Sequence, residues 1–408
     1  MAERPYPILT VNEKAARALR AGHPWVYGAE TTGPDRPAQN GDIVDVVTQK
    51  GRWLGAGFLN DHSKIRVRLL SRNTNDRFDE AFWRRRLQYA LDYRRTVMGP
   101  DFTTARLIFG EADQFPGLTV DLFGDILVTE VLSLGMERVK HLLYPQLVDL
   151  LAGYGVRVRA LYERNEAALR RKEGLPQEKG FCALPGLATD LDGHVTITEN
   201  GVRYDVDYIN GQKTGFFLDQ KYNRRAAAAL ARGRRVLDCF THTGAFALNC
   251  ARGGAEQVTA VDISKDAVAL TRRNAALNGL EDRVRAVQAD VFDLLTDLAR
   301  EKQHPYDYII LDPPAFTKSG ATVKNAYRGY KEINLKAMKL LPRGGYLATC
   351  SCSHFMTAPL FCQMLREAAA DASVSLRQIE DRRQSPDHPI LWGVPETEYL
   401  KFYLFQIV

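Results

Sequence analysis

The sequence has few cysteines and no long hydrophobic run. Its 408 residues include six cysteines, none before residue 182, which is too sparse for the disulfide framework of a secreted domain. Cys350 and Cys352 lack a matching second pair, so no zinc or other metal site is expected. No apolar run is long enough to span a membrane. Residues 1–5 lack the basic start and apolar core of a signal peptide, which predicts a cytoplasmic protein.

Excess positive charge is absent from three quarters of the chain. Residues 1–100 hold 17 Lys and Arg against 11 Asp and Glu, whereas the other 308 residues hold 38 of each kind. The whole net charge of +6 therefore lies at the N-terminal end, and it includes Arg66, Arg68, Arg72, Arg77 and the run Arg84-Arg85-Arg86. Such a segment is typical of docking to a polyanion. A solvated arginine-rich surface explains the same charge.

The length predicts two or three domains. Short strands with one helical stretch, residues 12–20, predict a small β-barrel over residues 1–73. A β-β-β-α-β order after a helix at 78–98 predicts a middle α+β domain over residues 74–190. Residues 191–408 form the third predicted domain.

Two strand patterns at the N-terminal end carry specific expectations. Residues 65–70 alternate apolar residues with arginine, which predicts one buried face and one face that displays guanidinium groups. Residues 156–162 are expected to form the last strand of the middle domain.

The third predicted domain alternates strands and helices. Asn200-Gly201 between two alternating runs predicts a β-hairpin that opens it. The following alternation predicts an α/β domain with a mostly parallel sheet covered on both faces. The expected strands are residues 236–239, 257–262, 284–288, 308–312, 345–350 and 401–406.

Acidic residues lie at the ends of the first three of these strands. Asp238 precedes a turn that opens a helix through Gly244, and this single glycine fits a phosphate-free ligand better than a dinucleotide. Asp262 lies 24 residues further on, where a carboxylate meets ribose hydroxyls. Asp290 follows the third strand, where it could accept the amino group of an adenine. A nucleotide-free α/β domain is the alternative. Together these positions resemble the class I S-adenosylmethionine-dependent methyltransferases, a Rossmann-like fold.

The fourth strand runs into Asp312-Pro313-Pro314-Ala315-Phe316. Two prolines fix φ and stiffen this loop, and in related methyltransferases an Asp/Asn-Pro-Pro loop holds the target base. Enzymes that methylate an exocyclic amine often have an aromatic residue directly after the prolines. Ala315 stands there instead, which disfavours that reaction.

The next strand ends at Cys350-Ser351-Cys352-Ser353 and is expected to face the Asp312 loop. Carbon 5 of a pyrimidine is a poor nucleophile, and attack of a thiolate on carbon 6 activates it. This covalent route needs a cysteine of lowered pKa. Two buried core cysteines are the alternative explanation.

Residues Asn210–Gln220, together with Asp312-Pro313-Pro314 and Ser351-Cys352-Ser353, closely resemble the bacterial family of ribosomal RNA large subunit methyltransferase I. The resemblance spans the chain, and residues 23–46 look like that family's N-terminal PUA domain, an RNA-binding barrel. Members methylate carbon 5 of a cytosine in 23S ribosomal RNA. The resemblance therefore implies S-adenosylmethionine as cofactor, and 23S RNA or a large-subunit assembly particle as partner. It leaves the oligomeric state open, a homodimer included, and implies no membrane partner.

The resemblance also implies individual roles. Cys352 would be the nucleophile, with Cys350 as second candidate, and Asp312 would orient and polarise the cytosine beside the cofactor. A two-cysteine mechanism is not expected, because Ala315 stands where another cytosine-methyltransferase group has its second cysteine. The residues implied in cofactor binding are Phe217, Gln220, Asp238, Thr241, Gly244, Asp262, Asp290 and Asp312.

Two other functions stay open at this point. One keeps the cofactor but methylates another base, such as guanine N7, without a covalent adduct. The other is a non-catalytic RNA-binding or ribosome-assembly protein that has kept the fold.

Overall fold

The computed structural model describes residues 4–301, 304–317 and 319–408. Residues 1–3, on which the signal-peptide prediction partly depends, lie outside this range. The chain forms two compact units. The first comprises residues 1–195, 206–218 and 386–397, and the second comprises residues 196–205, 219–385 and 398–408. This partition differs from a cut at residue 190, because two later segments join the first unit. The division into domains 1–73, 74–190 and 191–408 stays a prediction.

The first unit begins with a six-stranded sheet whose order is β2-β6-β5-β4-β1-β3. The helix α1 begins after Asn12, whose side chain accepts a hydrogen bond from the Ala15 amide and caps the helix. Apolar residues of β1, β2, β4, β5 and β6 pack with the apolar face of α1. The elements are β1 (Ile8–Val11), α1 (Glu13–Arg20), β2 (Trp25–Tyr27), β3 (Thr31–Pro34), β4 (Ile43–Thr48), β5 (Trp53–Leu59) and β6 (Ile65–Ser71).

The strand predicted at residues 65–70 is present as β6, but one expectation about it is wrong. The Arg68 side chain is only 11% exposed, and its guanidinium pairs with Glu111 and Glu173 instead of facing solvent. Arg66 pairs with Asp61 and donates to the Thr32 carbonyl. Some of the N-terminal arginines therefore form ion pairs within the fold.

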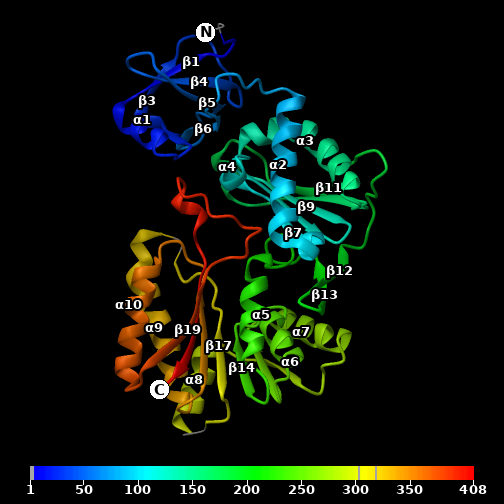
Figure 1. Ribbon diagram of the computed structural model, residues 1–408, viewed down its shortest axis with the longest axis vertical. Coiled ribbons are helices and arrows are strands. Elements are labelled where there is room, and N and C mark those ends of the chain that lie inside the picture. The colour runs from blue at the N-terminus through cyan, green and yellow to red at the C-terminus, as the bar shows by residue number, and fades with distance from the viewer. Residues whose placement is uncertain (1–3, 302–303, 318) are drawn as a thin grey trace. The chain divides into compact units, whose positions relative to one another are not determined.

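The same unit contains a five-stranded sheet of order β11-β10-β9-β8-β7. Figure 1 shows α2 and α3 side by side, and their residues share one core with β7, β8 and β9. The Asp79 side chain caps α2 by accepting from the Phe82 amide. The strand expected at residues 156–162 corresponds to β10, which spans Ala160–Asn165 and so begins and ends later in the chain. The elements are α2 (Glu80–Met98), β7 (Thr104–Phe109), β8 (Leu118–Phe123), β9 (Ile126–Val131), α3 (Leu134–Gly153), β10 (Ala160–Asn165), α4 (Leu169–Lys172) and β11 (Glu178–Phe181).

The hairpin predicted at Asn200-Gly201 is present, and both residues have positive φ, 51° and 76°. Asn200 tolerates this conformation because its short polar side chain can hydrogen-bond locally, and it donates to the Lys221 carbonyl. The hairpin strands are β12 (His194–Glu199) and β13 (Val202–Asp207), and helix α5 (Lys221–Ala229) follows.

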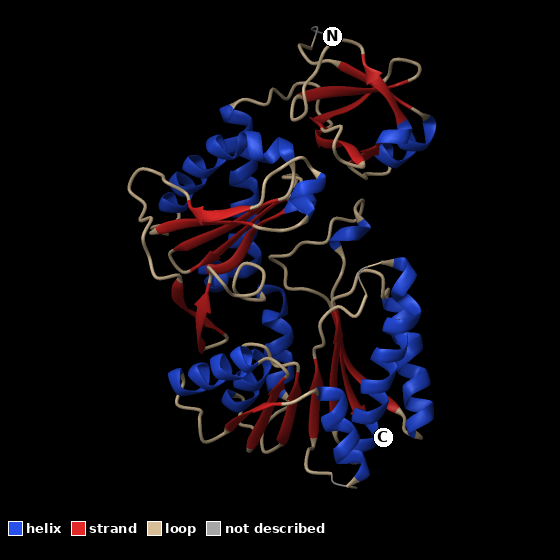
Figure 2. Ribbon diagram, turned by 180° about the vertical axis from the view of Figure 1, so that it is seen from behind, coloured by secondary structure: helices blue, strands red, loops and turns tan. Residues whose placement is uncertain are grey.

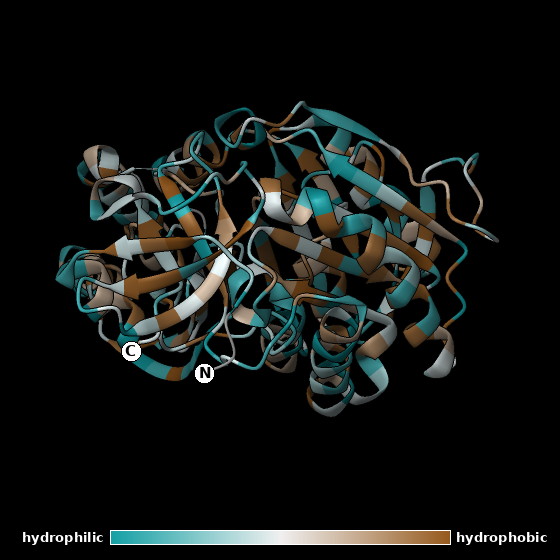
Figure 3. Ribbon diagram, turned by 90° about the horizontal axis from the view of Figure 1, so that it is seen from above, coloured by the Kyte–Doolittle hydropathy of each residue, from teal (hydrophilic) through white to brown (hydrophobic). Residues whose placement is uncertain are grey.

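The second unit holds a seven-stranded sheet of order β16-β15-β14-β17-β18-β20-β19. The first five strands in this order are parallel, and β20 runs antiparallel to its neighbours. Helices cover both faces of the sheet, as Figure 2 shows. Figure 3 shows helices that carry both hydrophobic and hydrophilic residues, as expected where one side faces a core and the other faces water. The expected α/β class is confirmed, although β19 was not predicted.

The elements of this sheet and its helices are β14 (Arg235–Cys239), α6 (Ala245–Arg252), β15 (Gln257–Asp262), α7 (Lys265–Leu277), β16 (Val284–Gln288), α8 (Val291–Arg300), β17 (Tyr308–Leu311), α9 (Val323–Leu340), β18 (Tyr346–Ser351), α10 (Ala358–Ala372), β19 (Leu376–Arg382) and β20 (Lys401–Ile407).

Candidate active site

Five predicted site residues lie at one edge of the sheet in the second unit. Because β14 to β18 are parallel neighbours, their carboxyl ends meet at that edge. These residues are Asp238, Asp262, Asp290, Asp312 and Cys352, each in the last residues of its strand or one to two residues beyond it.

The loop after β14 is tightly bent around Asp238. Phe240, His242 and Gly244 have positive φ of 63°, 51° and 79°. Thr241 Oγ1 and the Ala247 amide donate to Asp238 Oδ2 at 2.5 and 3.0 Å. Gly244 is required here, because a Cβ would lie 2.7 Å from the Thr271 methyl group in addition to the strain of its φ.

The second oxygen of Asp238, Oδ1, is buried and has no hydrogen-bond partner among the described residues. Burial raises the pKa of Asp238 to about 7, and the hydrogen bonds from Thr241 and Ala247 only partly oppose this. A buried carboxylate oxygen with no partner is costly unless a ligand satisfies it. Asp238 is therefore suited to a cationic ligand group.

Asp262 and Asp290 lie at the ends of the next two strands, where each accepts hydrogen bonds from backbone amides. Asp262 accepts from the His242 amide and the Ser264 amide, both at 2.9 Å. Asp290 caps α8 through the Phe292 amide at 2.7 Å. Between them Ile263 exposes 65% of its surface at the same edge. Ile263 was not predicted as a site residue, although the sequence shows an apolar residue directly after the acid that ends this strand.

Asp312 follows β17 and is held by Gln220. Gln220 Nε2 donates to Asp312 Oδ1 at 3.1 Å, while Gln220 Oε1 accepts from Asn223 at 2.7 Å. Burial, and then the negative charge of Asp219, raise the pKa of Asp312 to about 7, although part of its surface still meets solvent. At neutral pH this carboxyl is therefore divided between its neutral and charged forms. The predicted roles of both residues at the cofactor stay predictions.

Cys352 lies directly after β18, next to the end of β17. The segment is fixed on both sides, because Ser353 Oγ donates to the Thr317 carbonyl at 2.9 Å and Lys401 Nζ to the Ser353 carbonyl at 2.6 Å. Burial and the charge of Asp312 raise the pKa of the Cys352 thiol to about 12, and the positive charge of Lys401 opposes this. The expectation of a lowered pKa is thus wrong for the protein without ligands.

Cys350 differs from Cys352 in accessibility. Cys350 is fully buried in β18, whereas Cys352 is partly exposed. Burial raises the pKa of the Cys350 thiol, which also donates toward Asp312. Phe316, after the two prolines, packs on Tyr330 with 4.6 Å between ring centroids and belongs to the core.

Two further charged residues act on the site and were not singled out from the sequence. Asp219 raises the pKa of both Asp312 and Cys352, and its buried Oδ1 has no hydrogen-bond partner among the described residues. Lys401 is buried on β20, which lowers its pKa to about 8. Only the antiparallel pairing of β20 with β18 brings Lys401 to the cysteine segment. Phe217 belongs to the first unit, and its role stays a prediction.

No group of three or more His, Cys, Asp or Glu side chains suited to a metal ion occurs in the described part of the chain. Over the same ranges, no helix combines the length and hydrophobicity needed to cross a membrane.

The strand order, the bent loop after β14 and the unpaired Asp238 oxygen define an S-adenosylmethionine-dependent methyltransferase. Residues 183–406 match the family model described as S-adenosylmethionine-dependent methyltransferase, and residues 9–72 match a PUA-like domain. A structure from Streptococcus mutans described as a SAM-dependent methyltransferase superimposes with a TM-score of 0.81 at 22% identity, covering 98% of this chain and 100% of that one. A second, described as a methyltransferase complexed with SAH, has the same TM-score at 21% identity, with the same coverage of both chains.

Curated relatives of similar length define the family more narrowly. The chain is 36% identical to ribosomal RNA large subunit methyltransferase I of Klebsiella pneumoniae (strain 342), over 100% of both chains. It is 40% identical to the protein of that name from Shewanella denitrificans, over 94% of this chain and 95% of the relative. The chain belongs to the ribosomal RNA large subunit methyltransferase I family. The family and the cofactor predicted from the sequence are thereby confirmed.

Proposed function

We propose that this protein methylates carbon 5 of a cytosine in 23S ribosomal RNA through a covalent bond between Cys352 and carbon 6. The observation that carries the proposal is the partly exposed thiol of Cys352 beside the carboxyl of Asp312, at the ends of two neighbouring parallel strands. The reaction would take place in the cytoplasm.

S-adenosylmethionine, when bound, supplies a methyl group on a sulfonium centre that a carbon nucleophile can attack. Asp238 Oδ1, which has no partner among the described residues, fits the ammonium group of its methionine part. Asp262 would accept from the ribose hydroxyls, and Asp290 would lie on the adenine side with Ile263 against the ring. Thr241, Gly244, Gln220 and Phe217 complete the residues that we assign to this cofactor.

The first step that we propose is a proton transfer between Cys352 and Asp312. Since the charge of Asp312 raises the pKa of Cys352, protonation of Asp312 makes the thiolate easier to form. Net transfer of the thiol proton to Asp312 leaves one thiolate and one neutral carboxyl group. The neutral carboxyl group can donate to nitrogen 3 of the cytosine while the thiolate forms the S–C6 bond.

The adduct makes carbon 5 electron-rich, and carbon 5 takes the methyl group. A base then removes the proton from carbon 5, and its electron pair restores the C5=C6 bond as the S–C6 bond breaks. The thiolate of Cys352 is released, and nitrogen 3 returns its proton. Lys401 stabilises the thiolate in this sequence, because it carries the positive charge that lowers the pKa of Cys352.

Three observations support ribosomal RNA as the substrate. The curated relatives are named for that activity, a PUA-like domain matches residues 9–72, and the net positive charge of the chain lies in residues 1–100. Contacts of such cations with phosphates are salt-dependent. We therefore expect RNA affinity to fall steeply as salt is raised.

The decisive experiment compares cysteine variants on 23S RNA from a strain that lacks the enzyme, offered both free and in large-subunit particles. Cys352→Ala should abolish transfer while calorimetry still shows S-adenosylmethionine binding. Cys362→Ala is the matched control and should keep full activity, because the Cys362 thiol lies on α10 and donates to the Tyr403 hydroxyl instead of facing Asp312. Cys350→Ala tests the second candidate. RNA that contains 5-fluorocytidine should trap a covalent complex with the parent enzyme but not with Cys352→Ala.

The alternative functions give different results in the same experiment. Full activity of Cys352→Ala, with 7-methylguanosine in the nucleoside digest, would refute the covalent mechanism in favour of guanine N7. Absence of cofactor binding by the parent protein would indicate a non-catalytic RNA-binding role.

A further inference from the structure

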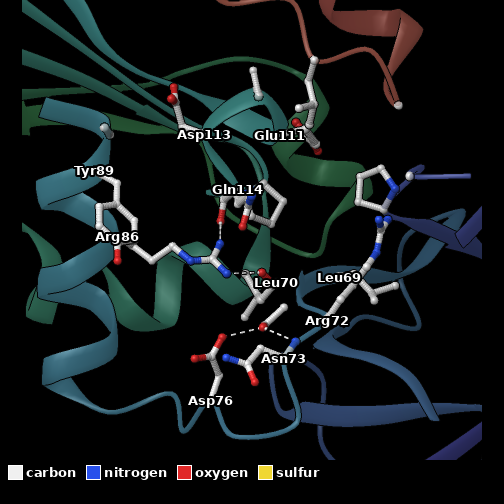
Figure 4. Close-up of a pocket in the computed structure, with 18 of the residues that line it drawn as sticks. Leu69, Leu70, Arg72, Asn73, Asp76, Arg86, Tyr89, Glu111, Asp113 and Gln114 are labelled. Atoms are coloured by element: carbon white, nitrogen blue, oxygen red, sulfur yellow. Dashed lines mark hydrogen bonds between the residues drawn. The ribbon is translucent and has the colours of Figure 1, made fainter. Parts of the chain in front are cut away.

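The first unit contains a pocket of about 800 Å³ that the methyl-transfer mechanism does not use. Its volume lies within the range of ligand sites, roughly 300–1,000 Å³. The residues that follow β6 form one wall and α2 forms another, as Figure 4 shows. Leu391 and Gly393, from the segment 386–397, complete its rim.

Two guanidinium groups line this pocket without an ion-pair partner in the described part of the chain. Arg86 donates to the carbonyls of Leu70 and Gln114 at 2.6 and 3.3 Å, and its guanidinium lies over the Phe82 ring. Arg72 donates only a long 3.4 Å bond to the His23 carbonyl. Backbone carbonyls orient a guanidinium but do not neutralise it. Burial lowers the pKa of Arg86 to about 10, so it remains a cation at pH 7.

Three carboxylates also line the pocket, but each is already paired. Asp113 accepts from both Nη atoms of the buried Arg94. Asp76 pairs with Arg85 and accepts from Ser71. Glu111 pairs with Arg68 and accepts from the Trp25 indole. The remaining unpaired charge on the wall is therefore positive.

Two aromatic side chains near this pocket are open to solvent, one on α2 and one on the segment that completes the rim. Tyr89 projects from α2 next to Arg86 and is 63% exposed. Trp392 is 95% exposed, and both residues that flank it line the pocket. The backbone there is held in place, because a Cβ on Gly393 would lie 2.9 Å from Gly22 Cα. An exposed indole offers a flat face on which a base can stack.

We propose that this pocket binds an unpaired segment of the RNA substrate, with a phosphodiester at Arg72 and Arg86 and bases stacked on Tyr89 and Trp392. The proposal rests on the ribosomal RNA substrate proposed above and adds a second contact with it in the first unit, whereas Asp312 and Cys352 lie in the second. The pairing of aromatic platforms with unpaired cations is what single strands require. A duplex offers its phosphates but stacks its bases internally, so it would leave both aromatic rings uncovered.

The test measures binding of the full-length protein to a labelled, mixed-sequence 12-nucleotide RNA, single-stranded or annealed to its complement, without cofactor. Tyr89→Leu and Trp392→Leu should each weaken binding of the single strand about 5- to 100-fold, the range found for loss of a stacked base. Tyr89→Phe keeps the ring and should stay within about twofold of the parent. Arg72→Ala should also reduce the slope of log affinity against log salt by about 0.7.

Arg300→Ala is the matched control for loss of charge, because Arg300 is 77% exposed on α8 in the second unit. Circular dichroism checks that each variant is folded. Parent-like binding by both Tyr89→Leu and Trp392→Leu would overturn the proposal, as would an equal loss of duplex binding. If the parent methylates 23S RNA while these variants show an unchanged KM, this inference fails and the proposed function stands. If the parent neither binds nor methylates the RNA, the proposed function fails with it.

Discussion

Asp238→Asn should make the protein more stable at neutral pH while it removes cofactor binding. In the folded chain, burial raises the pKa of Asp238 from its ordinary 3.8 to about 7. Between these two pH values the folded chain holds a proton that the unfolded chain has lost. The contribution of Asp238 to stability is therefore complete at low pH and is lost as pH rises toward 7.

The size of this effect follows from the shift. Each pH unit between about 4 and 7 costs roughly 1.4 kcal/mol of the free energy of unfolding. From pH 5 to pH 7.5 the parent should thus lose about 2–3 kcal/mol through Asp238. Asparagine does not titrate and has no such loss. It places an amide donor where Oδ1 lacks a partner, at a pH-independent cost of about 1–3 kcal/mol.

The measurement is urea unfolding of parent and Asp238→Asn at pH 5, 6, 7 and 7.5. The difference in free energy of unfolding between variant and parent should move in favour of the variant by about 2–3 kcal/mol across this range. Titrating groups that do not interact with Asp238 cancel in the difference, whereas Asp312 and Asp262, whose charges act on Asp238, contribute to it. Asp282→Asn, an exposed site in the same unit, is the control and should show a constant difference. A constant difference for Asp238→Asn would refute the assignment of a protonated, buried Asp238.

The remaining predictions concern the cofactor site and the core beside it. S-adenosylmethionine affinity should fall as pH drops below about 7, since Asp238 must lose its proton to pair with the ammonium group, and calorimetry in buffers of different ionisation enthalpy should show that proton released. Glu199→Gln should cost about 3–5 kcal/mol in urea unfolding, because it removes the carboxylate that accepts two hydrogen bonds from the buried Arg224. The control is Asp297→Asn, which breaks an exposed ion pair with Arg300 and should cost at most about 1 kcal/mol. Equal costs for the two variants would contradict this reasoning. Gly244→Ala should lower cofactor affinity and cost about 1–3 kcal/mol, since its Cβ would lie 2.7 Å from an α7 side chain; unchanged calorimetry would show that the loop adapts.

Local patterns were sufficient for much of the fold and of the cofactor site. Asp79 as a helix cap and Asn200-Gly201 as a hairpin depend on residues a few positions apart, so the sequence shows them directly. The acids at 238, 262 and 290 follow strands whose parallel order is implied by the strand-helix alternation. Their meeting at one edge was therefore predictable before any contact was known.

Other features depend on residues far apart in the chain. The strand β19 has a mostly polar, solvent-facing sequence, and it exists because β20 pairs with it. The guanidinium of Arg68 faces Glu111 and Glu173 only because the segments that carry them pack together. No periodicity reveals such pairs.

By itself, the sequence determined the class of fold and placed Asp238, Asp262 and Asp290 at the ends of neighbouring strands, since each depends on spacing along one strand or turn. The cofactor followed from the family that these motifs resemble. Only the tertiary structure decided the ionisation of the site. The pKa values of Asp238, Asp312 and Cys352 are set by desolvation and by charges from Asp219 and Lys401, which long-range packing brings to the strand ends. The same packing decided which N-terminal arginines form ion pairs within the protein and which can bind a ligand. A guanidinium can bind a phosphate only where the fold does not already pair it with a carboxylate.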